Sequence, residues 1–332
     1  MNIPISISVD EVVQAYQRKE LPISWIDKLR DEYFFKLFVP KDLGGLQLDL
    51  HEAMIALQFT ARIFPSLGWV HNLVAGANYF CGFFDEETAH TIFRQPGVMT
   101  AGSGATAGQA FQKDKGWLVS GEWSMCSGSK WATHFTGVTK NEKGELLTFI
   151  TDQENVKLVK SWPSAGLRMT ASDTFVLNQK FISDNQIFRI GKTKSYLNYE
   201  LYQMPFDFFA RLCLSATFQG LVEGWLIVFH QEQLSSNKTK TLEKKIKEKT
   251  ILLAQNRATL ILSWKRHYYG TPTQGFNIDY ANQLGNLHKA IYMDVMELYF
   301  QAGIRASYAE SITYHWLVDI QTAIQHFMLK PA

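Results

Sequence analysis

The chain has 332 residues, of which 46% are hydrophobic and 19% charged, with a formal net charge of +2. This length suits one large domain or two to three ordinary ones, and such a chain buries about three quarters of its unfolded surface without help from disulfides or metals. The balanced charge argues against a nucleic-acid partner. Aromatic residues make up 14%, which favours large internal contacts, subunit interfaces or a pocket for a flat ligand.

Residues 1–95 have the periodicity of helices. Asp49 can cap one of these helices, with Glu52 three residues later as its capping-box partner. Pro40 with Gly44-Gly45, and later Pro65, interrupt the pattern. We expect helices over residues 9–19, 25–38, 50–62 and 69–84, and a short one after Asp85.

Residues 96–190 change to strand periodicity, with turn residues between the strands. We interpret this region as an antiparallel sheet or partial barrel. The predicted strands are 109–113, 116–120, 135–139, 146–151, 156–160, 174–177 and 179–183.

Residues 191–332 return to helical periodicity and predict a helical bundle. The mixed charge run at 243–249 is interpreted as a solvated helix face. The expected helices are 207–233, 241–269, 279–307 and 311–328.

Cysteine usage and the N-terminal residues bear on location. Cys81, Cys126 and Cys213 occur without a CxxC spacing, which predicts free thiols in a reducing compartment. The start MNIPISISVDEVVQ lacks the basic and apolar regions of a signal peptide, and no uninterrupted apolar run has the length of a membrane span. We therefore expect a cytoplasmic protein with no membrane partner.

The most informative stretch is a hairpin at 98–132. It begins with small residues over 100–108, turns at 113–116, and ends in Ser124-Met125-Cys126-Ser127-Gly128-Ser129. We call residues 124–129 the ledge. Small residues allow close backbone approach, and hydroxyls beside large aromatics suit a flat ligand with a polar edge, such as an isoalloxazine ring. The alternative is an ordinary hairpin with its Trp residues in a core and Ser and Gly in its turn.

Several motifs in this order resemble the acyl-CoA dehydrogenase superfamily. LFVPKDLGG at 37–45 is similar to its VPxxxGG turn, and AGLRMTAS at 165–172 to its GxRxTxS signature. SLGWV at 66–70 and GEWSMCSGS at 121–129 resemble the branch of two-component flavin-dependent (group D) monooxygenases. The resemblance implies an α+β fold with an N-terminal helical domain (1–95), a middle antiparallel β-barrel-like domain (96–190) and a C-terminal helical bundle (191–332).

The resemblance also implies a flavin cofactor, FAD or FMN, and a homotetramer or homodimer. In this family pattern the flavin lies against the end of the hairpin and the segment that precedes a neighbouring strand. The cofactor-binding residues that it implies are Trp123, Cys126, Ser127, Gly128, Arg168 and Ser172.

Catalytic candidates come from the last helix and from the helix after GWV. Asp319 and His326 keep the seven-residue spacing of the branch's RxWRDxxxxxxH pattern, which would place both on one helix face, although Val318 stands where the pattern has Arg. His326 would supply a proton next to the flavin, since imidazole titrates near neutral pH. His71 is a further candidate. The histidines show no metal-ligand spacing, and we expect no metal.

Three functions remain open. The first is a monooxygenase-like oxidoreductase that takes reduced flavin from a separate reductase and acts on a small aromatic or heterocyclic substrate. The second is an acyl-CoA dehydrogenase-like enzyme with an unusual base; the expected late carboxylate is missing, and Glu310 is the nearest candidate. The third is a non-catalytic ligand-binding or assembly protein that retains the fold.

Overall fold

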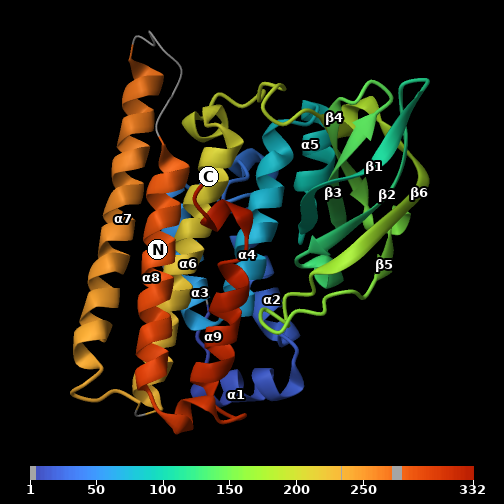
Figure 1. Cartoon of the computed structure of the whole chain (residues 1–332). Coiled ribbons are helices and arrows are strands. Elements are labelled where there is room, and N and C mark those ends of the chain that lie inside the picture. Colours follow the sequence, from blue (N-terminus) through green and yellow to red (C-terminus); the bar gives the residue numbers. More distant parts are fainter. Residues whose placement is uncertain (1–4, 233, 271–278) are drawn as a thin grey trace.

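The computed structural model describes residues 5–232, 234–270 and 279–332. A body of long helices carries a smaller sheet lobe on one side, and α4 (Pro65–Asn78) lies at the boundary between them (Figure 1). Asn78 at the end of α4 accepts a hydrogen bond from the backbone N–H of Thr100, at the start of the first strand, while its amide donates to the carbonyl of Phe35. α4 is therefore the element that fixes the sheet lobe on the helical body.

The N-terminal helices begin at capping residues, of which the sequence predicted the Asp49 and Glu52 pair, while α4 begins at Pro65 and not at Trp69 as expected. Ser8 with Glu11, and Asp49 with Glu52, form complete capping boxes, and Pro65 occupies the first turn of α4. Asp85 caps the last helix of this region by accepting from the N–H of Thr88. The other helices here are α1 (Val9–Arg18), α2 (Ile23–Asp31), α3 (Leu50–Ile63) and α5 (Glu86–Phe93).

The C-terminal helices surround α6 (Phe206–Gln231). This helix has the length and mean hydropathy, 1.5, of a membrane span, but 89% of its most apolar window is buried inside the protein, which identifies it as a core helix. Glu232, just after α6, accepts hydrogen bonds from Ser311 and from the N–H groups of Ile312 and Thr313. The remaining helices are α7 (Lys240–Tyr269), α8 (Tyr280–Gln301) and α9 (Ile312–Ala323).

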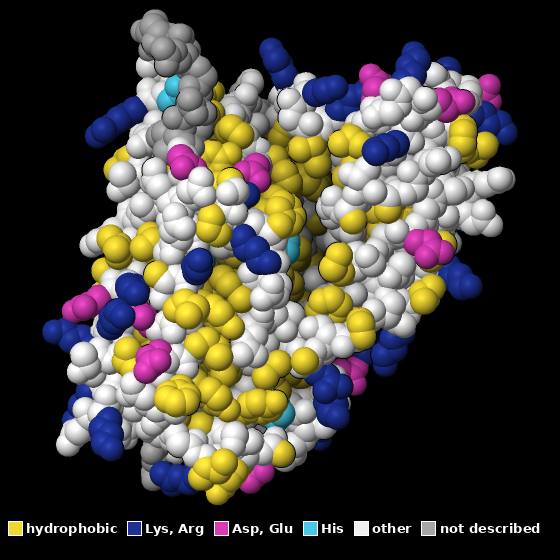
Figure 2. Space-filling view, viewed as in Figure 1, with side chains coloured by type: hydrophobic (Ala, Val, Ile, Leu, Met, Phe, Trp, Pro, Cys, Tyr) yellow, Lys and Arg dark blue, Asp and Glu magenta, His cyan; other side chains and the backbone are white. Residues whose placement is uncertain are grey.

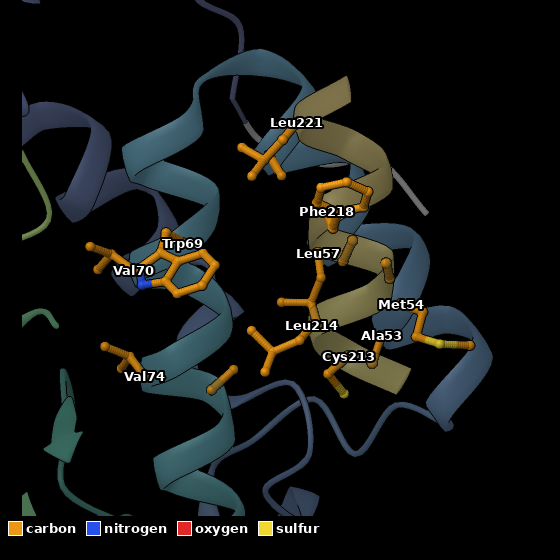
Figure 3. Packing of buried hydrophobic residues seen from close by; sticks show 14 of the residues in the cluster. Ala53, Met54, Leu57, Trp69, Val70, Val74, Cys213, Leu214, Phe218 and Leu221 are labelled. Atoms are coloured by element: carbon orange, nitrogen blue, oxygen red, sulfur yellow. The ribbon is translucent and has the colours of Figure 1, made fainter. Parts of the chain in front are cut away.

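The N-terminal and C-terminal helices share one hydrophobic core. In Figure 3, Trp69 of α4 points toward Leu214 and Phe218 of α6. Val70 and Val74 point to the other side of α4, away from α6 (Figure 3). Thus the helices on both sides of the sheet region in sequence pack as one body in space.

The described residues of the lobe form one seven-stranded sheet in the order β5-β6-β2-β1-β3-β4-β7. Neighbouring strands are antiparallel except β1 and β3, which are parallel, so the expectation of an antiparallel sheet was wrong at this one pair. The strands are β1 (Thr100–Lys113), β2 (Gly116–Cys126), β3 (His134–Asn141), β4 (Leu146–Asp152), β5 (Lys157–Val159), β6 (Asp173–Ser183) and β7 (Ile187–Phe188).

The small-residue run at 100–108 belongs to β1 and is not a loop. It pairs with β3, with irregularities between Ser103 and Thr106 and between Thr106 and Gln109. The lobe has its own core, in which Trp123 stacks on Phe175 at 4.9 Å and meets Phe149 edge-on at 5.1 Å.

Candidate functional site

One face of α4 forms the floor of a groove between the two lobes. Leu73 and Gly76 are the partly exposed residues of its second half, while Trp69 one turn earlier and Phe80 just after the helix lie on the same side and are buried, at 7% and 8% exposure. A Cβ added at Gly76 would meet nothing within 4 Å, so the space above this position is open. Figure 2 shows a hollow between the helical body and the sheet lobe, with hydrophobic side chains along its sides.

The ledge forms the wall of this groove on the sheet side. Gly128 has a φ of +82°, and a Cβ there would approach the side chain of Val74 to 2.9 Å. Its N–H donates to the carbonyl of Thr170 at 2.8 Å. Glycine is required here both by the backbone conformation and by the close approach to α4.

A bulge in β2 decides which ledge side chains face outward. The pairing of β2 with β6 shifts between Trp123 and Cys126, and Met125 adopts a φ of +58°. Because the shift changes the strand alternation, Cys126 turns into the lobe core and Met125 is 58% exposed. Sequence alternation alone missed Met125 as a ledge side chain available to a ligand.

Trp123 and Cys126, which we expected beside the flavin, lie inside the sheet lobe. Both are fully buried, and the Trp123 indole N–H donates to the carbonyl of Val138 at 2.8 Å. Burial raises the pKa of the Cys126 thiol well above its usual range, which keeps it protonated. Both side chains therefore pack in the core of the sheet lobe, and not on its surface as a place beside a flavin would require.

The hydroxyls of the ledge connect to the segment before β6. Thr170 donates to the carbonyl of Leu167 at 2.8 Å, so its hydroxyl accepts from Ser172 at 2.7 Å. Ser172 in turn accepts from Ser127 at 2.8 Å. The Ser127 hydroxyl proton is therefore used in the bond to Ser172, while the Ser127 oxygen can still accept a hydrogen bond.

The same segment contains two further non-glycine residues with positive φ. Leu167 has a φ of +49° and Ala171 of +47°, conformations that cost about 1–3 kcal/mol each unless their surroundings impose them. Arg168, between them, is exposed. Together with Met125, these positions concentrate backbone strain around the ledge.

His326 contacts Trp69, which points away from the side of α4 where Val74 meets the ledge (Figure 3). Its ring meets the Trp69 ring edge-on at 5.8 Å, and its Nδ1 accepts from the N–H of Met328 at 3.3 Å. Burial, with a smaller effect of nearby Arg211, lowers the pKa of His326 to about 4. The ring is therefore neutral at physiological pH, and its proton is on Nε2, which has no hydrogen-bond partner within the described chain.

The C-terminal tail, residues 326–332, fixes the position of His326. Arg211 of α6 donates to the carbonyls of Met328 and Lys330, at 3.0 and 3.2 Å, and also pairs with Asp207. His288 of α8 donates from Nδ1 to the carbonyl of Leu329 at 3.0 Å. The tail is thus held against α6 and α8.

Asp319 does not share a face with His326, because α9 ends at Ala323 and His326 lies beyond the helix. Its carboxylate is 3% exposed and accepts from the N–H of Leu167 at 2.5 Å and from the Tyr16 hydroxyl at 2.8 Å. Burial raises the pKa of Asp319 to about 7, although both hydrogen bonds lower it. The expected pairing of the two side chains is therefore corrected: Asp319 points to the segment that supports the ledge.

His71 lies in the helical core with no exposed surface. Its Nε2 donates to the carbonyl of Phe34 and its Nδ1 accepts from Thr60, both at 2.9 Å. Burial lowers the pKa of His71 to about 4. Both ring nitrogens are engaged, so His71 has no free atom to offer a ligand, and the structure does not bring it to the groove.

Two other hollows lie on the helical body. One has a volume of about 220 Å³ and is lined by residues from the start of α3, the 199–204 segment and α7. The other, about 420 Å³, lies between α8 and the C-terminal tail. Neither is lined by the ledge or by His326. Within the described ranges, no group of three or more His, Cys, Asp or Glu residues could hold a metal ion.

Comparison with known proteins gives sequence relatives and structural neighbours, while no family model matches. The chain is 28% identical over 247 residues to a pigment production hydroxylase of Rhodococcus sp., covering 70% of this chain and 64% of that protein. It is 26% identical over 218 residues to the flavin-dependent monooxygenase oxygenase subunit HsaA of Mycobacterium tuberculosis, covering 62% and 55%. The chain therefore spans somewhat more than half the length of these relatives.

The structural likeness extends further than the sequence likeness. XiaF from Streptomyces sp., solved with FADH2 and glycerol, superposes with a TM-score of 0.84 over 97% of this chain and 88% of that one, at 18% identity. This likeness shows the fold.

Proposed function

Because this chain is a homologue of flavin-dependent monooxygenase oxygenase subunits and has their acyl-CoA dehydrogenase-like fold, we propose that it is itself such an oxygenase component. Its substrate would be a small aromatic or heterocyclic molecule, and a separate reductase would supply reduced FAD or FMN. The observation that carries the proposal is the open groove between the ledge and His326, over the α4 floor.

The residues of the groove fit a flat ring. The floor is apolar and open above Gly76, and Met125 presents an exposed apolar side chain from the ledge. Ser127 lies buried in the ledge at one side, bonded to Ser172, and His326 offers a donor at the other. An apolar site with a small number of placed polar groups is what a planar, polar-edged cofactor requires. When bound there, a reduced flavin supplies the electrons that activate dioxygen.

The chain's own residues would orient the ring and exclude water. Gly128 permits close approach at the ledge, and the α4 stripe with Met125 covers the apolar ring faces. His326 is neutral, so at pH 7 it acts as a hydrogen-bond donor from Nε2 and not as a positive charge. This revises the expectation that His326 titrates near working pH.

The quaternary structure and location follow from the surface and from the cysteines. Large apolar side chains are exposed on the outer sides of α7 and α8, including Phe300 at 83%. A patch of this kind favours burial against another copy, and we propose a homodimer or homotetramer. The free, buried Cys81, Cys126 and Cys213 support a cytoplasmic location.

The structure disfavours the acyl-CoA dehydrogenase reading. Glu310, its candidate base, is exposed and precedes α9, whereas His326 follows α9 at the groove. The helix between them has 12 residues, about 18 Å of rise. A carboxylate at that end is too distant to act beside a ring in the groove.

The direct test is to titrate the purified protein with reduced FMN and with reduced FAD, and then to assay a panel of phenols and indoles with an added flavin reductase. We expect binding of at least one flavin and a hydroxylated product. His326→Ala should retain flavin binding but release more hydrogen peroxide per product, while His326→Gln, which keeps an N–H donor, should be intermediate. Absence of binding to either reduced flavin would favour a non-catalytic protein that retains the fold.

A further inference from the structure

The carboxylate of Asp319 is a junction between segments far apart in sequence. It lies on α9, accepts from Tyr16 of α1, and accepts from the backbone N–H of Leu167. No ion pair to Asp319 occurs within the described residues, although the carboxylate is nearly fully buried. A buried carboxylate without a cation is costly and is retained where its hydrogen bonds have a role.

The hydrogen bond from Leu167 holds a strained backbone. Leu167 has positive φ, and its carbonyl accepts from Thr170 and from the Trp162 indole, both at 2.8 Å. The preceding Gly166 packs directly on α9: a Cβ there would come within 2.1 Å of the Val318 carbonyl oxygen. The N–H of Leu167 is therefore held by Asp319 of α9, and its carbonyl is held by Trp162 and Thr170 of its own segment.

The segment then carries the ledge. The carbonyl of Thr170 accepts from the N–H of Gly128, and that of Ala171 accepts from the N–H and the hydroxyl of Ser129. Ser172 accepts from the Ser127 hydroxyl. These hydrogen bonds join ledge residues 127–129 to residues 170–172, which belong to the segment that Asp319 ties to α9 through Leu167.

We propose that Asp319 and Tyr16 are positioning residues that set the ledge relative to α9 and the tail, and so set the width of the flavin groove. His326 follows α9 directly, so the two walls of the groove are joined through this carboxylate. The inference rests on the proposed flavin site. Its physical basis is that Asp319 connects α9 to the strained turn, and the turn connects to the ledge.

The test compares Asp319→Ala, Asp319→Asn and Tyr16→Phe, with Tyr314→Phe as a control that removes a hydroxyl from α9 without touching the turn. Reduced-flavin affinity and hydrogen exchange of the Gly128 and Ser129 amides are measured on each full-length protein. Asp319→Ala should weaken flavin binding and speed amide exchange by about tenfold or more, since the buried acceptor for the Leu167 N–H and the Tyr16 hydroxyl is lost. Asp319→Asn keeps an acceptor for Leu167 and should stay within about threefold of the parent in both readouts.

Parental flavin affinity and parental ledge exchange in folded Asp319→Ala would overturn the proposal. If Asp319→Ala does not fold, Tyr16→Phe is the deciding variant. Amide exchange at Gly128 and Ser129 about threefold faster than in the parent supports the positioning role, and exchange at the parental rate overturns it. Amide exchange does not need flavin. Failure of the parent to bind flavin would therefore count against the proposed function, while ledge exchange would still test Asp319.

Discussion

Gly76 is the residue at which the groove is most open. Glycine within a helix is less stable than alanine by up to about 1 kcal/mol, so its presence in α4 needs a reason other than helix formation. The structure provides one, because a side chain at this position would meet open space. We interpret the missing side chain at Gly76 as the feature of α4 that leaves space for a ring.

Gly76→Phe should fill this space and weaken reduced-flavin binding by at least about tenfold, with little loss of stability. Gly76→Ala is the matched control: it should raise the free energy of unfolding by about 0.5–1 kcal/mol and leave flavin affinity nearly unchanged. Flavin titration and chemical unfolding of both variants provide the measurements. Parental affinity in Gly76→Phe would place the flavin elsewhere.

His71 should affect stability and its pH dependence, not catalysis. Its pKa is lowered to about 4 by burial, against the ordinary 6.5 of an unfolded chain. The unfolded state therefore takes up a proton below pH 6.5 that the folded state does not, and the stabilisation by neutral His71 is lost as pH falls from 6.5 toward 4.

His71→Gln removes this titration. The difference in unfolding free energy between parent and variant should therefore shrink by roughly 2 kcal/mol between pH 7.5 and pH 5. Urea unfolding at these two pH values is the measurement. A constant difference would show that the pKa of His71 is the same in the folded and the unfolded protein. Flavin affinity at pH 7.5 should remain parental in the folded variant.

At the scale of elements, two connections determine the shape of the groove. The bulge at the end of β2 turns Met125 outward and Cys126 inward. The C-terminal tail, clamped by Arg211 and His288, brings His326 to the edge of Trp69. Neither wall is formed by a regular helix or strand; each is the irregular end of one.

Arg211→Met keeps the aliphatic stem but removes the donors to the Met328 and Lys330 carbonyls. We expect the free energy of unfolding to fall by about 1–3 kcal/mol and the tail amides to exchange faster. Peroxide release per product should also rise, because His326 is then less well placed. Lys330→Met is the control, since Lys330 lies at the exposed surface of the same tail. Unchanged tail exchange in Arg211→Met would contradict the clamp.

At the scale of the whole molecule, α7 and α8 expose several large apolar side chains that no other described part of the chain covers. Met293 and Phe300 are seven residues apart on α8, at 57% and 83% exposure, and Ile304 just beyond is 76% exposed. Hydrophobic side chains are also visible across the helical body in Figure 2. Side chains of this size are seldom left in water together on a monomer.

Phe300→Asp should shift the protein toward smaller species in light scattering after size-exclusion chromatography. A buried charge at a subunit interface has no partner there and destabilises the association. Phe111→Asp, at a 49% exposed position on β1 far from these helices in sequence, serves as the control and should leave the mass unchanged. Equal masses for both variants and the parent would show that this face of α8 is not part of a subunit interface.

The sequence by itself determined the succession of helices, strands and helices, because period and capping are local properties. The capping box at Asp49, the break at Pro65 and the hairpin at 113–116 all follow from neighbours in the chain. The family resemblance also located the ledge and the segment at 165–172, which the structure does bring together.

The tertiary structure alone decided which of these residues face the groove. A one-residue irregularity near the end of β2 reverses the alternation after Trp123, so the burial of Cys126 and the exposure of Met125 depend on pairing with β6. The end of α9 at Ala323 separates Asp319 from His326. Packing of distant segments brings Tyr16 and Leu167 to the Asp319 carboxylate, and burial lowers the pKa of His326 so that its ring is neutral. Burial and hydrogen-bond partners are contributed by residues remote in sequence, and a local pattern does not contain them.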